Sequence, residues 1–273
     1  MFQLLMNNEV DRMFFYRKLA REQLVCEVCE LGGEIITITS AEEKNFRVKL
    51  ARLLLEMWVI HSKKDSLTDM IKTYYYFEEE QEVHAILEII FERVLTREST
   101  KHTVDLQAKE QLLNIILLEM DQTTPLDYQV CLSNYDDLFH TLMINEIGYA
   151  IDEWKQEERY QDFIQSIRNY MENQMVKSNV LHIVQGKQFT FYREDGYKYS
   201  IEELRKVIIE EPLYIVGLDE NELNLTPIVA LSPCYIYIYG RDPSEAKTTA
   251  VQNIFHERVT YKHLQSFPFA HVE

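Results

Sequence analysis

The pair Cys26 and Cys29 has the spacing of a redox centre or of one half of a zinc site. A zinc site needs four ligands, and the other cysteines, Cys131 and Cys234, stand alone in the sequence. A thioredoxin-like pair would begin a helix after a strand, whereas this pair falls in a short apolar stretch before a glycine turn. We therefore expect structural cysteines in a strand.

A carboxylate-histidine set occurs on one predicted helix, where Glu80, His84 and Glu88 follow one another at intervals of four residues. Such residues share a helix face and could ligate a metal if a facing helix supplied a matching motif. Asp137 and His140 could be that motif, but no pattern places the two helices face to face. The acidic run around Glu80 is typical of a solvated helix face, so we expect neither a metal nor another cofactor.

Three tyrosines, Tyr235, Tyr237 and Tyr239, alternate with apolar residues and lie on one face of a predicted strand. Aromatic sheet faces can stack the bases of single-stranded RNA. That function also needs cations for the phosphates, and the chain has 28 basic against 45 acidic residues, a net charge of −17. We expect a face covered by helices, with hydroxyls at its edge, and no nucleic acid as partner.

A ligand site is also conceivable at Gly240-Arg241-Asp242, directly after the tyrosine strand. Asp242-Pro243 predicts the start of a helix that runs to about His256, and residues 258–262 predict a further strand. Strand, helix and strand in so few residues form a βαβ unit with parallel strands. Such sheets bind ligands beyond the carboxyl ends of the strands, and Arg241 beside a helix N-terminus could hold an anion.

Composition excludes several other classes of protein. The 273 residues include seven glycines, and 46% are hydrophobic, which describes a helix-rich globular chain rather than a disordered one. We find no P-loop, no Ser-His-Asp order and no G-x-S-x-G motif, so no enzyme class is indicated. No apolar run is long enough for a membrane span, and the first residues lack the basic region of a secretory signal. We expect a reduced, cytoplasmic protein.

Residues 1–40 predict a small β-α-β-β unit in which Gly32-Gly33 turns a hairpin. Ser40 and Glu43 form a capping-box pair, which opens a helix with a core-facing apolar stripe. The pattern then stays helical to about residue 176, with one clear break at Pro125. Further helices are expected over residues 67–75, 78–95, 103–119, 135–155 and 159–175.

The last third changes to the period of β-strands. Residues 180–184 and 188–192 predict a hairpin, Ser200 with Glu203 opens a helix that stops before Pro212, and residues 222–231 predict a short helical stretch. The fold class is therefore α+β: a small N-terminal β-α-β-β unit, a mostly helical middle, and a C-terminal mixed sheet with a β-hairpin and a βαβ unit. The expected regions are 1–40, 41–178 and 179–273, packed as one body or two.

Several segments resemble the YtxC-like family of sporulation proteins. They are the helix residues 158–164 and 167–170, the hairpin residues 180–184 and 191–196, the run 227–233 leading into 235–238, and the ending 253–259. The likeness is strong over about 120 residues, and none of these motifs is catalytic. Family members often end in closely spaced cysteines after the last strand, whereas residues 260–269 of this chain contain none.

The resemblance implies a cytoplasmic protein of endospore-forming bacteria, with no assigned biochemical activity. Our leading hypothesis is a non-catalytic protein that binds another protein. The alternative is a small-ligand protein or enzyme with its site at Gly240-Arg241-Asp242. Nucleic-acid binding is the third hypothesis, and the net charge opposes it.

Overall fold

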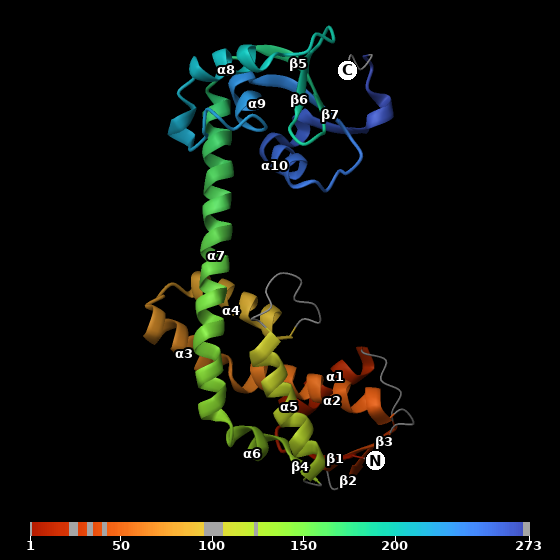
Figure 1. The fold of residues 1–273 in the computed structure, drawn as a ribbon. Coiled ribbons are helices and arrows are strands. Elements are labelled where there is room, and N and C mark those ends of the chain that lie inside the picture. Colours follow the sequence, from red (N-terminus) through yellow and green to blue (C-terminus); the bar gives the residue numbers. More distant parts are fainter. Residues whose placement is uncertain are drawn as a thin grey trace. The chain divides into compact units, whose positions relative to one another are not determined.

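The computed structural model describes residues 2–21, 27–31, 35–39, 43–95, 106–122 and 125–269 (Figure 1). The chain divides into two compact units, Met1–Gln156 and Glu157–Glu273. The division falls inside helix α7, which spans Asp136–Glu172. The three regions expected from the sequence stay a prediction about domains, and the two units are described separately below.

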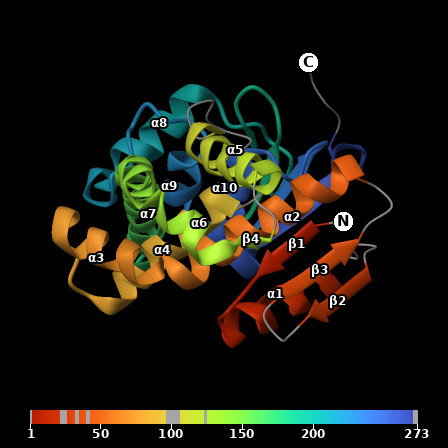
Figure 2. The same cartoon turned by 90° about the horizontal axis from the view of Figure 1, so that it is seen from below.

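The first unit begins with the predicted β-α-β-β order: β1 (Phe2–Leu5), α1 (Glu9–Arg21), β2 (Glu27–Leu31) and β3 (Ile35–Thr39). Strand β3 pairs antiparallel with both β2 and β1 (Figure 2). The strand order is β2-β3-β1-β4, and the sequence gives no sign of β4 (Leu126–Asp127), which pairs parallel to β1. Gly32, Gly33 and Ser40, on which the predicted hairpin turn and capping box depend, lie outside the described residues.

Apart from β4, the rest of the first unit is helical, as predicted. It contains α2 (Glu43–Met57), the π-helical turn η1 (Trp58–Ser62), α3 (Lys64–Tyr75), α4 (Glu80–Leu95), α5 (Leu106–Gln122) and α6 (Tyr128–Ser133). The apolar stripe of α2 is buried, with Leu50, Leu54 and Met57 fully enclosed beside Ile36 and Ile38 of β3. Burial of about 1.5–3 kcal/mol per large apolar side chain holds sheet and helices together.

At the predicted break, Pro125 is followed by strand β4 and by the N-cap of helix α6. After β4, the carboxylate of Asp127 accepts hydrogen bonds from the N–H groups of Gln129 (3.1 Å) and Val130 (3.0 Å). These are donors that the first turn of α6 cannot satisfy within the helix. Asp127 therefore ends β4 and at the same time caps the start of α6.

Helix α7 corrects the prediction of two helices over 135–155 and 159–175, because one helix runs without a break from Asp136 to Glu172. The residues between the predicted helices, Gln156-Glu157-Glu158, are polar but are good helix formers. Polarity there reflects exposure and does not interrupt the backbone. None of the described helices has both the length and the apolar character needed to cross a bilayer.

The second unit contains the sheet predicted for the last third of the chain. Its strands are β5 (Ser178–Val184), β6 (Thr190–Arg193), β7 (Pro233–Gly240) and β8 (Val259–His263), in the order β6-β5-β7-β8. Strands β5 and β6 are antiparallel, so the hairpin is confirmed. Strands β5, β7 and β8 are mutually parallel, so the βαβ unit is also confirmed.

Helices pack on one face of this sheet. They are α8 (Ile201–Ile209), η2 (Leu213–Val216), α9 (Thr226–Leu231) and α10 (Ala246–Phe255). The Ser200–Glu203 capping box at α8 is present in both directions, as predicted. The buried Leu181, Ile183, Ile236 and Ile238 of the strands share one core with these helices and with the last turns of α7. The α+β class predicted from the sequence is confirmed.

Candidate functional site

The carboxyl end of β7, where the sequence predicts a ligand site around Gly240-Arg241-Asp242, is filled by the side chain of Gln185. Its Oε1 accepts hydrogen bonds from the main-chain N–H groups of Arg241 (3.0 Å) and Asp242 (3.3 Å). Its Nε2 donates to the carbonyl of Asp242 (2.7 Å) and to the hydroxyl of Thr248 (2.5 Å). The main-chain donors that an anion would use are thus already bound within the chain.

The helix after β7 also begins later than predicted. Helix α10 starts at Ala246 and not at Asp242-Pro243. The carboxylate of Asp242 accepts a hydrogen bond from the N–H of Ser244 (2.9 Å), which makes a local turn instead of a helix cap. The exposed Arg241 is therefore separated in the chain from the first helical residue, and the expected pairing with a helix N-terminus is lost.

The other face of the C-terminal sheet carries a group of rings that we call the aromatic face: His182 of β5, Tyr192 of β6, and Tyr237 and Tyr239 of β7. The register sets His182 opposite both Tyr192 and Tyr237. Tyr239 is only 2% exposed, whereas Tyr235, near the start of β7, is 56% exposed. The aromatic face thus passes from a buried end to an open one.

His182 is the centre of the aromatic face. Its ring stacks near the rings of Tyr237 and Tyr239, with centroids 5.5 Å and 5.8 Å away. Its Nδ1 lies 3.0 Å from the hydroxyl of Tyr239. Burial lowers the pKa of His182, the ammonium of Lys262 lowers it further, and the carboxylate of Glu194 acts in the opposite sense.

The prediction that helices cover the tyrosines is wrong, because the helices pack on the opposite face. The aromatic face is covered instead by Phe267 and Phe269, which follow β8 and the 3₁₀ turn η4 (Leu264–Ser266). The Nζ of Lys262 lies 4.2 Å from the ring centroid of Tyr237, a cation–π contact beside this cover. The sequence shows the alternation of the tyrosines but has no signal for the residues that meet them.

The candidate metal ligands predicted from the sequence do not come together in one site. Glu88 and His84 approach each other on α4, with 3.6 Å between Oε1 and Nδ1, and both side chains are about two-thirds exposed. His140 of α7 contacts the hydroxyl of Tyr74 instead (3.3 Å). Across the described residues, no group of three or more His, Cys, Asp and Glu side chains is arranged to hold a metal ion.

The cysteines divide between described and undescribed parts of the chain. Cys29 lies in strand β2, as predicted, while Cys26 is outside the described residues. Cys131 is buried and Cys234 is half-buried, and both are free thiols. Burial, followed by the carboxylates of Glu119 and Asp127, raises the pKa of Cys131 to about 12, so this thiol is poorly suited to nucleophilic chemistry.

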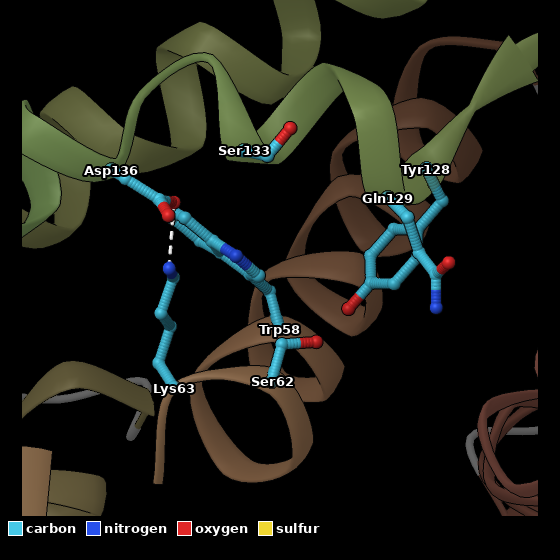
Figure 3. A pocket seen from close by; sticks show the side chains of 7 residues that line it. All are labelled: Trp58, Ser62, Lys63, Tyr128, Gln129, Ser133 and Asp136. Carbon is cyan, nitrogen blue, oxygen red and sulfur yellow. Dashed lines mark ion pairs between the residues drawn. The ribbon is translucent and has the colours of Figure 1, made fainter. Parts of the chain in front are cut away.

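A polar pocket of about 210 Å³ lies in the first unit, between η1, α6 and the start of α7 (Figure 3). Its lining residues are Trp58, Ser62, Lys63, Tyr128, Gln129, Ser133 and Asp136. The ion pair between Lys63 and Asp136 (2.6 Å) spans one side. Pockets for drug-sized ligands usually have about 300–1,000 Å³, so this one suits only a small polar molecule.

The π-helical turn η1 explains why the pocket forms there. The N–H of Lys63 donates to the carbonyl of Trp58 (3.0 Å), which inserts one residue into the regular helical spacing. Such turns often occur at functional sites. Lys63 then lies over the rings of Trp58 and Phe139, at 5.6 Å and 5.7 Å from their centroids, and is held in place by both.

Tyr128 forms part of the pocket wall and is 1% exposed. Its hydroxyl makes no hydrogen bond of normal geometry among the described residues, and Ser62 is the polar side chain that it faces. Burial raises the pKa of Tyr128 strongly, the charge of Asp11 raises it further, and Ser62 lowers it. The phenol therefore stays protonated, and Figure 3 shows it directed toward the η1 turn. Nothing in the residue spacing indicated this pocket in advance.

The fold defines an α+β protein with one four-stranded mixed sheet in each of its two units. The YtxC-like family model matches residues 48–260, and the chain belongs to this family, as the resemblance predicted. The chain is also similar to the uncharacterized protein YtxC of Bacillus subtilis (strain 168), with 32% identity over 127 residues. That match covers 45% of this chain and 43% of the relative, so less than half of the relative is represented. No solved structure matches the chain.

Proposed function

We propose that the protein acts in the cytoplasm during endospore formation by binding another protein, without catalysing a reaction. The sporulation role rests on the family resemblance. The binding role rests on one observation, a run of exposed apolar side chains at the end of α8, which we call the 209–215 surface. Ile209, Tyr214 and Ile215 are 71%, 79% and 66% exposed.

Buried neighbouring side chains hold the backbone of this surface in place. In the single turn of η2, Leu213 and Val216 point into the core of the sheet, so Tyr214 and Ile215 between them point outward. Exposed apolar side chains grouped on a fixed backbone are typical of protein-binding surfaces, because they bury area without first losing backbone freedom.

Glu211 ties the same segment to the end of α7. Its carboxylate accepts a hydrogen bond from the hydroxyl of Tyr170 (2.7 Å) and pairs with Lys177. Met175 and Val176, which directly precede Lys177, are 85% and 54% exposed. The ion pair therefore joins a second apolar stretch to the 209–215 surface.

The charge around the surface favours a basic partner. Residues 201–222 contain seven acidic and two basic side chains, in a chain of net charge −17. We propose a partner that presents apolar side chains bordered by lysine or arginine, since opposite charges steer such an encounter. Binding should then weaken as salt rises, because the Debye length falls to about 3 Å at 1 M.

A photo-crosslinking amino acid at position 214 tests this proposal in sporulating cells. The matched control has the same amino acid at position 197, where the native tyrosine is 58% exposed in the same unit. We expect one protein to crosslink from position 214 and not from 197. The purified partner should bind the wild-type chain in calorimetry, and Tyr214→Ser with Ile215→Ser should weaken binding by at least about tenfold, as for central interface residues.

Equal crosslinking from both positions, or wild-type affinity in the double variant, would contradict the proposal.

A second candidate function, small-ligand binding, is favoured by the pocket at Trp58 and Asp136. It is not favoured by Gly240-Arg241-Asp242, where the side chain of Gln185 already binds the main-chain N–H donors. Saturation-transfer NMR with a library of small polar metabolites would test it. Ligand resonances that respond to the wild-type chain and not to Lys63→Met are the expected result.

A further inference from the structure

The segment Leu264–Phe269, which we call the strap, lies on the aromatic face through two rings. Phe267 packs against Tyr192 and Tyr239, with centroids 4.9 Å and 5.1 Å away. Phe269 meets the ring of His182 edge-on at 5.2 Å. Two phenylalanines separated by one proline thus take up two neighbouring positions on the sheet.

Ring packing attaches the strap to the aromatic face. Strand β8 ends at His263, so the strap follows the sheet without extending it. Within the strap, the N–H of Phe267 donates to the carbonyl of Leu264 (3.1 Å), which closes a local turn on the sheet. Phe267 and Phe269 are only partly buried, so their release would expose a limited apolar area.

His182 lies beneath the strap and is 8% exposed. The groups that face it are Lys262 from β8, Glu194 after β6, Tyr192 from β6, and Tyr237 with Tyr239 from β7. Lys262 repels a proton on the imidazole and Glu194 attracts one, but burial favours the neutral ring most. The covered arrangement therefore suits neutral His182, which can accept a hydrogen bond from the hydroxyl of Tyr239.

We propose that the aromatic face is a second binding surface, that the strap occupies it within the same chain, and that protonation of His182 releases the strap. Once the strap is released, the aromatic face would bind a partner segment that resembles the strap, with two aromatic side chains two positions apart. This proposal does not depend on the 209–215 surface.

The direction of the pH effect follows from linkage. The covered state binds a proton less well than the open state, whose histidine should titrate near its ordinary pKa of about 6.5. The strap is therefore fully docked above about pH 7.5 and loosens as the pH falls through about 6.5.

Amide hydrogen exchange of the full chain, read by mass spectrometry on peptides covering the strap, tests the release. After correction for intrinsic exchange rates, we expect strap protection at pH 5.5 to be at least about threefold lower than at pH 7.5. In His182→Gln this pH dependence should disappear, whereas His256→Gln, outside the aromatic face, should keep it. Unchanged protection in the wild type, or a persistent pH effect in His182→Gln, would overturn the proposal.

A second measurement keeps the proposal testable if His182→Gln does not fold. Linkage requires that loss of the strap raise the pKa of His182. NMR titration of the imidazole should therefore show a higher pKa in Phe269→Ala than in the wild type, and equal values would contradict the coupling.

The partner class is tested with a synthetic peptide of the strap's own sequence, Leu-Gln-Ser-Phe-Pro-Phe. It should perturb the NMR signals of Tyr192 and Tyr237 in the full-length Phe267→Ala/Phe269→Ala variant at pH 7.5. The same peptide with both phenylalanines replaced by alanine is the control. Absence of binding, or equal binding of the control peptide, would overturn the assignment of the face as a site for aromatic segments.

Discussion

The amide oxygen of Gln185 lies 1.6 Å from the position that a Cβ atom at residue 240 would occupy. Gly240 therefore allows the Gln185 side chain to enter the carboxyl end of β7 and to bind Arg241, Asp242 and Thr248 there. The glutamine joins β5, β7 and the start of α10 at one point.

Gly240→Ala should destabilise the C-terminal unit by about 1–3 kcal/mol, because the added methyl displaces the amide and its hydrogen bonds. Urea unfolding followed by circular dichroism would show the loss. Fluorescence provides an internal control, since Trp58 and Trp154 both belong to the first unit and their transition should stay in place. Combined with Gln185→Ala, the glycine substitution should cost clearly less than it does alone. Strictly additive effects would mean that the two residues do not interact.

Gly196→Ala should destabilise the protein more than Gly217→Ala does. Both glycines have left-handed backbones, with φ of +87° and +74°, so both substitutions carry a strain of about 1–2 kcal/mol. At Gly196, however, the new Cβ would lie 2.4 Å from Cδ1 of Phe269, whereas at Gly217 the nearest atoms, those of Phe163, are 3.9 Å away. Thermal unfolding of the two variants measures the difference. Equal losses would show that Phe269 moves aside at no cost.

Cys131 should react very slowly in the folded protein. With a pKa raised to about 12, its thiolate fraction at pH 8 is about 10⁻⁴, against roughly a quarter for an unperturbed cysteine. Alkylation by iodoacetamide, followed on the peptide containing residue 131, should be about a thousandfold slower than in urea. A rate within tenfold of the unfolded value would contradict the burial of this thiol.

Lys177→Met should lower the free energy of unfolding at pH 7 by about 0.5–1 kcal/mol, the range of a partly exposed ion pair. Lys177, followed by the hydroxyl of Tyr170, lowers the pKa of Glu211 below its ordinary value, while burial opposes them. A lowered carboxylate pKa stabilises the fold above about pH 4.3, and this contribution is lost as the pH falls through the folded-state pKa.

The difference between Lys177→Met and the wild type should therefore vanish in acid. Lys206→Met, which removes an exposed ammonium from α8 of the same unit, is the matched control. A gap between Lys177→Met and the wild type that persists at pH 3 would show that Lys177 stabilises by packing and not by charge.

Features encoded by neighbouring residues could be predicted from the sequence. The β-branched run Ile35–Thr39 forms a strand, Ser200 and Glu203 cap a helix, and the tyrosine alternation in β7 places its rings on one face. In each case the signal and the structure lie within a few residues of each other, so the local period is sufficient.

Features that depend on distant partners could not be predicted. Gln185 meets Asp242 from 57 positions away, and Phe269 reaches His182 from a segment with no regular pattern. The two residues of β4 are too few for a period, and they become a strand only because β1 is beside them. The polar Gln156-Glu157-Glu158 lies between two helices predicted from the sequence but belongs to one continuous helix, because a polar composition reflects exposure as well as backbone interruption.

The continuity of α7 determines where a fragment containing only one unit should begin or end. A fragment that begins at Glu157 would start in mid-helix and lack the native first turn and the residues that precede it. A fragment that begins before Asp136 retains the native first turn and gives the C-terminal sheet an intact helix to fold on. Expression of either unit should therefore be planned around the ends of this helix and not around the boundary between the units.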